Sequence, residues 1–303
     1  MSLSADPQTT SIDVTGPYDL AEVALMGFGH RDERSFDGVM RMAFCLDGDH
    51  ETQVGVEARQ VEASVELTVY GPPGAAVLSG ERLADVARQV ARVISLDHDG
   101  AAFDAVCLAD PALARLHAVA PGFRPALFYS PYEAAVWSVL SARRSRTQAI
   151  PLRTRLCELY GTPFVLAGQP LSALPTPSQL LAVEALPGLP ADRVPRLHAI
   201  ARAATGRQLG AERLRALDPA EAERELQRLP GIGPFYSSLI VLRAVGHADV
   251  LAFEGHARSA VEELYGVDHE LTPDELTTLA EGWRPFRTWV MVSARALGGR
   301  LAG

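Results

Sequence analysis

The first hundred residues alternate between apolar and polar positions in short runs, a pattern that is typical of half-buried β-strands. Three β-prone runs are GVMRMAFCL (38–46), TQVGVEA (52–58) and ASVELTVYG (63–71), of which the last two alternate clearly. Turns are expected at Asp47-Gly48-Asp49 and at Ala58-Arg59-Gln60, between the successive runs. The following segment, about 81–95, has its apolar side chains on one helical stripe. These patterns predict an antiparallel sheet packed by a helix.

From about residue 102 onward the pattern predicts helices only, and proline or glycine marks nearly every junction. The predicted helices cover 131–142, 145–160, 176–185, 191–204, 219–228, 234–246, 255–265, 273–281 and 284–298. The expected fold class is therefore α+β, with an N-terminal domain over 1–101 and an all-helical domain over 102–303.

The most informative segment of the helical part is LQRLPGIGPFYSSLIVLRA (226–244). Gly231 and Gly233 lie in a tight turn between two helices, where glycine takes a positive φ at little cost. Ile232 between them is expected to anchor the turn in the core, and Pro234 suits the first turn of the next helix. Such a helix-hairpin-helix directs backbone N–H groups at an anion such as a DNA phosphate. The alternative is an ordinary corner between helices with capping glycines.

The charge of the chain is unevenly distributed. The net charge is −9, but residues 1–130 hold 9 Arg against 19 acidic residues, whereas residues 131–303 hold 19 Arg against 18. Because phosphate contacts need cations, a DNA-facing surface is expected in the C-terminal two-thirds. All 28 basic residues are arginine. No lysine amine is therefore available to form a Schiff base.

From Gly16 to its end the chain resembles the 3-methyladenine DNA glycosylase II family, within the helix-hairpin-helix DNA glycosylase superfamily. The resemblance rests on six segments in the same order: GPYDL (16–20), ARVISLDHD with FDAV (91–106), SPYEAAVWSVLSARRS (130–145), LPGIGPF (229–235), ADV (248–250) and EGWRPFRTWV (281–290). GPYDL is similar to the opening strand of that family. The resemblance implies a protein that binds double-stranded DNA and removes alkylated bases during base-excision repair. No cysteine follows Cys157, so the four-cysteine cluster of endonuclease-III-like relatives is missing and no metal or cofactor is expected.

The chain departs from this family at its essential aspartate. The family carries that residue about five positions after the Asp-Val of the link, and this register places Gly255 there. The adjacent Glu254 is the nearest carboxylate and the candidate catalytic acid, one residue early and one methylene longer. The alternative is that Glu254 only favours the start of a helix, where an acid interacts well with the helix dipole.

The resemblance also implies a base pocket and a corner that enters the duplex. Phe235, Trp289 and Arg295 are the pocket candidates, although Trp289 is equally suited to the core. Arg143 and Arg144 stand at the corner that fills the gap left by a flipped base, where arginine contacts phosphates or stacks on bases. The alternative there is a solvated arginine cluster.

Three functions remain open from sequence alone. The first is a monofunctional glycosylase with Glu254 as its acid, and a lysine-dependent lyase is excluded by composition. The second is a silent DNA- or lesion-binding protein, and the third is a helical domain that binds a small molecule or a protein. The N-terminus, MSLSADPQTTS, lacks the features of a secretory signal, and no apolar run is long enough to span a membrane. We therefore expect a cytoplasmic location at the nucleoid, with no obligate protein partner.

Overall fold

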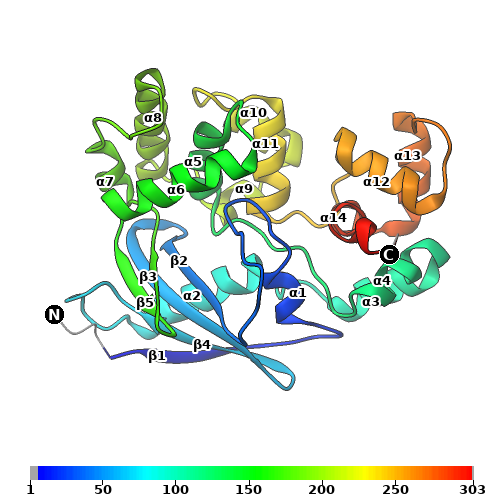
Figure 1. Ribbon diagram of the computed structural model, residues 1–303, viewed down its shortest axis with the longest axis horizontal. Coiled ribbons are helices and arrows are strands. Elements are labelled where there is room, and N and C mark those ends of the chain that lie inside the picture. The colour runs from blue at the N-terminus through cyan, green and yellow to red at the C-terminus, as the bar shows by residue number, and fades with distance from the viewer. Residues whose placement is uncertain (1–5, 302–303) are drawn as a thin grey trace.

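The computed structural model describes residues 6–301. Residues 1–5 and 302–303 lie outside the described part. They include the first residues of MSLSADPQTTS and the outer ends of the two expected domains. The described chain begins with a four-stranded antiparallel sheet in the order β1-β4-β3-β2 (Figure 1). Its strands are β1 (Gln8–Asp13), β2 (Met40–Leu46), β3 (Asp49–Val61) and β4 (Ser64–Tyr70).

Two local predictions for this sheet are wrong. The expected turn at Ala58-Arg59-Gln60 is part of β3, which pairs with β4 as far as Val61. The chain turns instead at Glu62, whose φ of 51° is left-handed. Residues 16–20 form no strand, because Asp19 accepts hydrogen bonds from the amides of the next turn and starts α1 (Leu20–Ala24). The opening strand is β1, which the sequence patterns did not indicate.

The helix expected beside the sheet is α2 (Gly80–Val93), and it begins at an N-cap made by Ser79. Val86, Val90 and Val93 on its apolar face are fully buried. They share one core with strand residues such as Phe44 and Val56. The apolar stripe is therefore buried, as its helical spacing predicts, and it packs α2 against one face of the sheet.

Further helices follow, most of them bounded by proline or by a capping side chain. They are α3 (Gly100–Ala109), α4 (Pro111–Val119), α5 (Pro131–Ser141), α6 (Arg146–Tyr160), α7 (Pro177–Leu181), α8 (Val194–Thr205), α9 (Ala211–Arg215), α10 (Pro219–Leu226), α11 (Pro234–Ile240), α12 (Gly255–Tyr265), α13 (Pro273–Ala280) and α14 (Arg287–Leu297). A π-helical turn, Val241–Val245, continues α11. The helix expected over 176–185 ends early, at Leu181.

The prediction of helices only after residue 102 is also wrong. A short antiparallel pair, β5 (Pro163–Leu166) and β6 (Gln169–Ser172), lies between α6 and α7. Its Phe164 packs over Gly55 of β3, where an added Cβ would lie only 2.7 Å from the ring. The pair therefore extends the helical part onto the N-terminal sheet.

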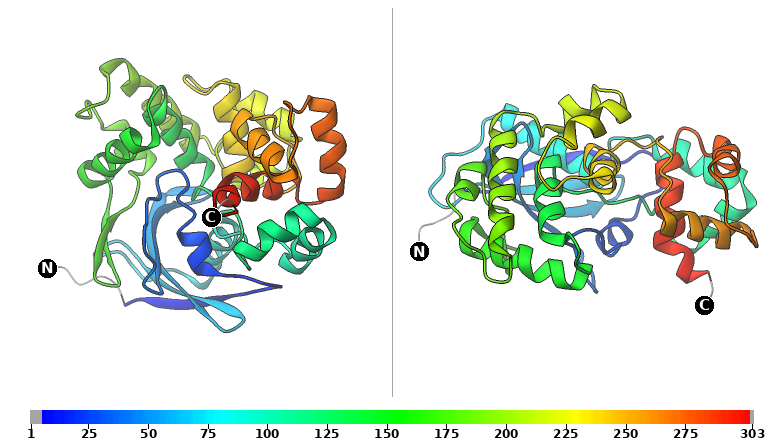
Figure 2. Two further views of the ribbon diagram at one scale, coloured as in Figure 1. Left: turned by 45° about the vertical axis from the view of Figure 1, so that its right-hand side comes forward. Right: turned by 90° about the horizontal axis from the view of Figure 1, so that it is seen from above.

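The helices form two groups with separate cores (Figure 1; Figure 2 shows the groups from two other sides). One core joins α5 through α11, and the other joins α3 and α4 to α12 through α14. The α+β fold class is confirmed. The domain division at residue 101 stays a prediction, and α3 begins at Gly100.

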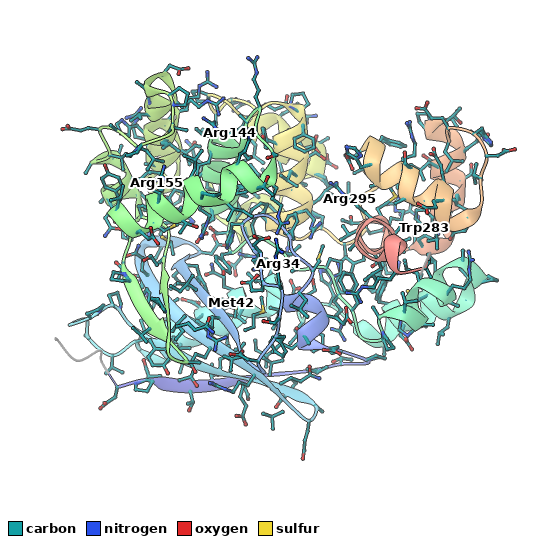
Figure 3. The ribbon with its side chains drawn as sticks, in the orientation of Figure 1. Arg34, Met42, Arg144, Arg155, Trp283 and Arg295 are labelled. Atoms are coloured by element: carbon teal, nitrogen blue, oxygen red, sulfur yellow. The ribbon has the colours of Figure 1, made fainter. Side chains whose placement is uncertain are left out.

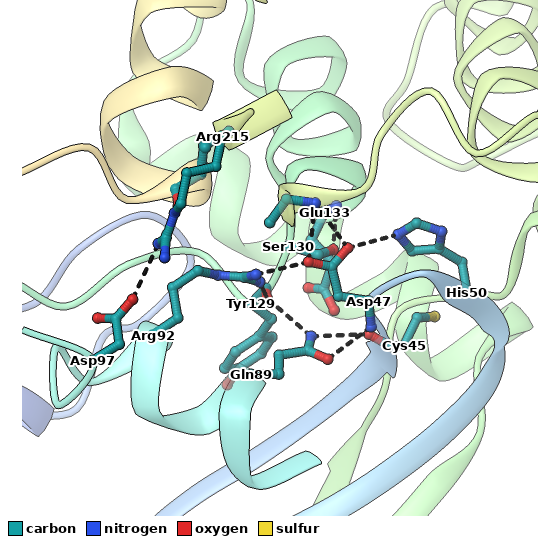
Figure 4. Close-up of polar contacts among 12 residues, drawn as sticks. Cys45, Asp47, His50, Gln89, Arg92, Asp97, Tyr129, Ser130, Glu133 and Arg215 are labelled. Atoms are coloured by element: carbon teal, nitrogen blue, oxygen red, sulfur yellow. Dashed lines mark hydrogen bonds and ion pairs between the residues drawn. The ribbon is translucent and has the colours of Figure 1, made fainter. Parts of the chain in front are cut away.

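A buried polar network joins the sheet to the first helical group (Figure 4). The Asp47 carboxylate accepts a hydrogen bond from Arg92 at 2.7 Å and another from the amide of Ala211, which begins α9. Gln89 donates to the carbonyls of Cys45 and Tyr129. Because these groups are buried and paired, they hold α2, the sheet and α9 in a defined relation.

Within residues 6–301 no helix has the length and apolar character needed to cross a membrane.

Candidate functional site

The glycine turn between α10 and α11 has two different glycines. Gly231 adopts a φ of +95°, which side-chain-bearing residues rarely adopt. Gly233 has a φ of −97° and a ψ of −174°, extended backbone that any residue adopts. The expectation that both glycines use positive φ is therefore wrong for Gly233. Ile232 between them is 4% exposed and packs in the core of the first helical group.

The start of α11 offers backbone amides that the helix itself does not satisfy. Pro234 is the first residue of α11, and the N-cap Gly233 provides no side chain to accept from the helix. The amides of Phe235 and Tyr236 lie in the first turn, where no preceding carbonyl of the helix is available to them. The turn therefore presents backbone donors next to an exposed surface, as an anion-binding hairpin requires.

Four arginines lie close together beside this turn: Arg143, Arg144, Arg193 and Arg196. An added Cβ on Gly231 would lie 3.1 Å from the Cδ of Arg196, so the cluster adjoins the hairpin. Burial lowers the pKa of Arg193, and the charges of Arg144, Arg196 and Arg143 lower it further. The guanidinium groups are therefore close enough to repel one another.

Arg143 and Arg144 occupy the corner between α5 and α6. Arg143 is exposed and has a left-handed φ of +58°. Arg144 donates to the carbonyls of Leu140 at 3.3 Å and Gly188 at 3.1 Å, and it is labelled at the top of Figure 3. The corner is therefore a cationic edge next to the hairpin, with one side chain free in solvent and the other fixed.

A cavity of about 270 Å³ lies where α11, α12 and α14 meet. Its walls are mainly apolar side chains from these helices and from the loop before α12: Phe235, Leu239, Leu242, Phe253, Met291 and Val292. Three charged residues also line it, and they are Arg243, Glu254 and Arg295. Figure 3 shows Arg295 between α11 and α12, on the side where the two helical groups face each other. A mainly apolar cavity with a few polar groups is the usual form of a ligand site.

Glu254 is the N-cap of α12 and faces this cavity. Its carboxylate accepts hydrogen bonds from the amides of His256 at 3.2 Å and Ala257 at 3.0 Å. The same carboxylate forms an ion pair with Arg295, 3.1 Å away. Gly255 is the first residue of the helix and places no side chain in the cavity. Gly255 and Glu254 lie at or next to the position of the family's aspartate, and only Glu254 has a carboxylate. The Glu254 side chain is 26% exposed.

The loop before α12 is held by the start of α14. Asp249 forms ion pairs with Arg284 at 3.0 Å and Arg287 at 2.8 Å. The Thr288 hydroxyl accepts from the amide of Val250 at 3.0 Å and donates to its carbonyl at 2.7 Å. Two of the segments that carry the family resemblance therefore meet, and they fix the loop that leads to Glu254.

The remaining site candidates divide between the cavity and the core. Phe235 and Arg295 line the cavity, as expected of pocket residues. Trp289 does not, since it is 3% exposed and stacks edge-on against Phe103 with ring centres 5.0 Å apart. The assignment of Trp289 to the base pocket is therefore corrected in favour of the core, because it lies on the side of α14 that faces α3.

Sequence reasoning missed most of the residues that line the cavity, and Arg243 and Phe253 are the two that most affect its chemistry. Arg243 is the single charged residue in the apolar run LIVLRAV, and that isolation was an available signal. Phe253 is 55% exposed in the loop before α12, and Phe235 is 59% exposed, which leaves two aromatic rings at the cavity uncovered. Exposed large apolar side chains beside a cavity indicate a binding surface.

The chain is similar in sequence and in structure to known proteins. No family model matches it. It is 29% identical over 203 residues to a Mycobacterium tuberculosis protein described as a "Probable bifunctional transcriptional activator/DNA repair enzyme AlkA", and these residues are 65% of this chain and 40% of that protein. The chain thus spans less than half the length of that relative.

Two solved structures share the fold over nearly the whole chain. One is a 3-methyladenine DNA glycosylase from Archaeoglobus fulgidus, with a TM-score of 0.75, 20% identity and coverage of 96% of this chain and 98% of that one. The other is MBOgg1 in complex with a low-affinity DNA ligand, with a TM-score of 0.72, 15% identity and coverage of 99% of both chains. The chain is therefore similar to helix-hairpin-helix DNA glycosylases in sequence, over 203 residues, and in fold, over nearly its whole length, which confirms the resemblance seen in its motifs.

Proposed function

We propose that this protein binds double-stranded DNA, flips a damaged nucleotide into the cavity between α11, α12 and α14, and hydrolyses its glycosidic bond. The observation that carries the proposal is the position of Glu254. Its carboxylate lines the same cavity as Phe235, the residue that directly follows the glycine hairpin. A base extruded from a duplex held at the hairpin would therefore meet an acid at the cavity.

The hairpin and the arginine corner contact different parts of the bound DNA. The amides around Gly233 suit a phosphate, and a phosphate contact positions the duplex without reading its sequence. Arg143 at the exposed corner suits a phosphate beside the gap that a flipped nucleotide leaves in the stack. The apolar walls of the cavity suit the faces of a base, with Phe235 and Phe253 available for stacking.

The chemistry requires one bond to break and one to form. The C1′–N bond breaks with its electron pair on the departing base, and positive charge develops on the deoxyribose, which the Glu254 carboxylate stabilises. A water oxygen then bonds to C1′ and its proton passes to the carboxylate or to solvent. A neutral base leaves as an anion and takes up a proton, whereas a cationic base leaves as a neutral molecule. No lysine is present to form a Schiff base with the sugar. The product is therefore an abasic site in an intact strand.

A silent DNA-binding protein is the second candidate, and one observation favours it. The Glu254 carboxylate is already engaged by two amides and by Arg295. A carboxylate in that state is stabilised as a helix cap, with less capacity left for a substrate. The third candidate, a small-molecule or protein-binding domain, predicts no affinity for duplexes.

Single-turnover base release separates these candidates. Excess protein is incubated with duplexes that each contain one lesion: 3-methyladenine, 7-methylguanine, hypoxanthine or 1,N6-ethenoadenine. We expect release of at least one base, with strand breakage only after alkali. Binding without release from any of the four would support the silent protein, and breakage without alkali would contradict the hydrolytic route.

From the DNA substrate we also propose a cytoplasmic location at the nucleoid.

A further inference from the structure

We propose that the cavity discriminates damaged bases by charge: it accepts neutral lesions, with Arg243 and Arg295 as the specificity-determining residues, and disfavours cationic N-alkylated purines. This inference rests on the proposed function, because it concerns which base enters the same cavity.

The first observation is the balance of charges that line the cavity. Arg243 and Arg295 are two cations, and Glu254 is the one anionic residue among the described residues that line it. Arg295 and Glu254 form an ion pair at 3.1 Å, so the Glu254 charge offsets part of the Arg295 charge. Arg243 remains as an uncompensated positive charge at the cavity.

Arg243 is held in place without a carboxylate. It donates to the carbonyl of Ala126, and its guanidinium lies 3.6 Å from the ring centre of Phe28. Its Nε has no hydrogen-bond partner among the described residues. Burial lowers the pKa of Arg243 to about 9, and the charges of Arg295 and Arg31 contribute to that fall. The group therefore remains a cation at neutral pH, in surroundings that screen its charge weakly.

The second observation is the supply of hydrogen-bond donors. A guanidinium has five N–H donors and no acceptor. The Arg295 side chain is 57% exposed, and its guanidinium pairs with Glu254 alone among the described residues. Its remaining donors can meet the carbonyl oxygen of hypoxanthine or the ring nitrogens of ethenoadenine, both of which are neutral bases. A 7-methylguanine or 3-methyladenine nucleotide carries a formal positive charge, which Arg243 and Arg295 repel.

Charge also matters when the bond breaks. A neutral base leaves with developing negative charge, whereas a cationic base leaves as a neutral molecule. Cations fixed at the cavity stabilise the first transition state and have no developing charge to stabilise in the second. The two arginines therefore favour neutral lesions both in binding and in bond cleavage.

The test compares the protein with Arg295→Leu and with a control, Arg300→Leu. Arg300 is also a partly exposed arginine with one ion pair, to Glu22, and it does not line the cavity. Single-turnover rates are measured on hypoxanthine and 7-methylguanine duplexes, each corrected for spontaneous release. We expect the ratio of the hypoxanthine rate to the 7-methylguanine rate to fall about tenfold in Arg295→Leu, which corresponds to the loss of one modest charge interaction, and to stay unchanged in Arg300→Leu.

A binding arm keeps the inference separate from catalysis. Each lesion is placed on a 2′-fluoro sugar, which slows bond cleavage, and affinity is measured for the two duplexes and for an undamaged one. Tighter binding of the hypoxanthine duplex by the unmodified protein, reduced in Arg295→Leu, supports the inference even if no base is released, in which case only the enzymatic function fails. Equal or tighter binding of the 7-methylguanine duplex overturns the inference, and so does an absence of duplex binding.

Discussion

The two glycines of the hairpin give the sharpest prediction about its construction. Gly231→Ala introduces a side chain where φ is +95°, and its Cβ would lie 3.1 Å from Arg196. Gly233→Ala introduces one where φ is −97° and no heavy atom lies within 4 Å. The same chemical change is therefore made two residues apart in opposite steric surroundings.

The magnitudes follow from three effects. A left-handed conformation costs a residue with a Cβ about 1–2 kcal/mol. Replacing glycine by alanine also restricts the unfolded chain, which stabilises the protein by about 0.4–1 kcal/mol. At Gly233, which is an N-cap, alanine is less favourable than glycine by roughly half a kcal/mol. We therefore expect Gly231→Ala to lower the free energy of unfolding by about 1 kcal/mol and Gly233→Ala to change it by less than about 0.5 kcal/mol.

Urea unfolding followed by tryptophan fluorescence measures both variants against the unmodified protein. Since the position of Arg196 beside Gly231 depends on the same turn, Gly231→Ala is also expected to weaken duplex binding. Equal losses of stability in the two variants, or a larger loss in Gly233→Ala, would refute the reasoning about the turn.

Three further predictions concern the DNA edge, the core and the charge of the cavity. Arg143→Ala is expected to reduce the slope of log affinity against log salt by about 0.9, the value for one lost phosphate contact, and an unchanged slope in a salt titration would remove Arg143 from the interface. Ile232→Ala is expected to lower the free energy of unfolding by about 2–4 kcal/mol, because a buried side chain is truncated in the core; chemical unfolding measures this, and a loss under 1 kcal/mol would contradict its role as an anchor. The folded state lowers the pKa of Arg243 to about 9, so the folded protein releases this proton before the unfolded chain does. Raising the pH through 9 should therefore relieve the cost of the buried charge and raise the free energy of unfolding, as urea unfolding at pH 7.5 and 9.5 would reveal; no gain in stability would contradict it.

The elements that the sequence predicts well are those with local signals. The helix expected over 255–265 has the same bounds as α12, because Glu254 caps its start and Gly266 ends it with a φ of +67°. The α2 helix is similarly defined by its apolar stripe and by Ser79. Local caps and periodicity are sufficient where the surrounding fold agrees with them.

The errors arise where tertiary packing decides. β3 continues through Arg59 and Gln60 because β4 pairs with both residues, although their polarity indicated a turn. The pair β5–β6 is too short to show a clear alternation, and its place is fixed by Phe164 packing over Gly55. Phe164 and Gly55 lie more than a hundred positions apart in the sequence, so no local window contains that contact.

The sequence indicated three of the residues that line the cavity but not how their charges are paired. The family register directed attention to Gly255 and Glu254, and the cavity brings Glu254, Phe235 and Arg295 together. Sequence could not show that Arg295 pairs with Glu254, since the two residues are 41 positions apart. Nor could it distinguish the face of α14 that lines the cavity from the face that carries Trp289 into the core.

The role of Glu254 is the central claim, and one comparison of rates tests it most directly. Single-turnover excision is measured for Glu254→Gln on the best substrate, with Glu263→Gln as the control, since Glu263 is an exposed acid on the same helix. We predict that Glu254→Gln slows excision by about 10²–10³-fold while its duplex affinity stays within about threefold, and that Glu263→Gln behaves as the unmodified protein. An unchanged rate in Glu254→Gln would show that this carboxylate only caps its helix.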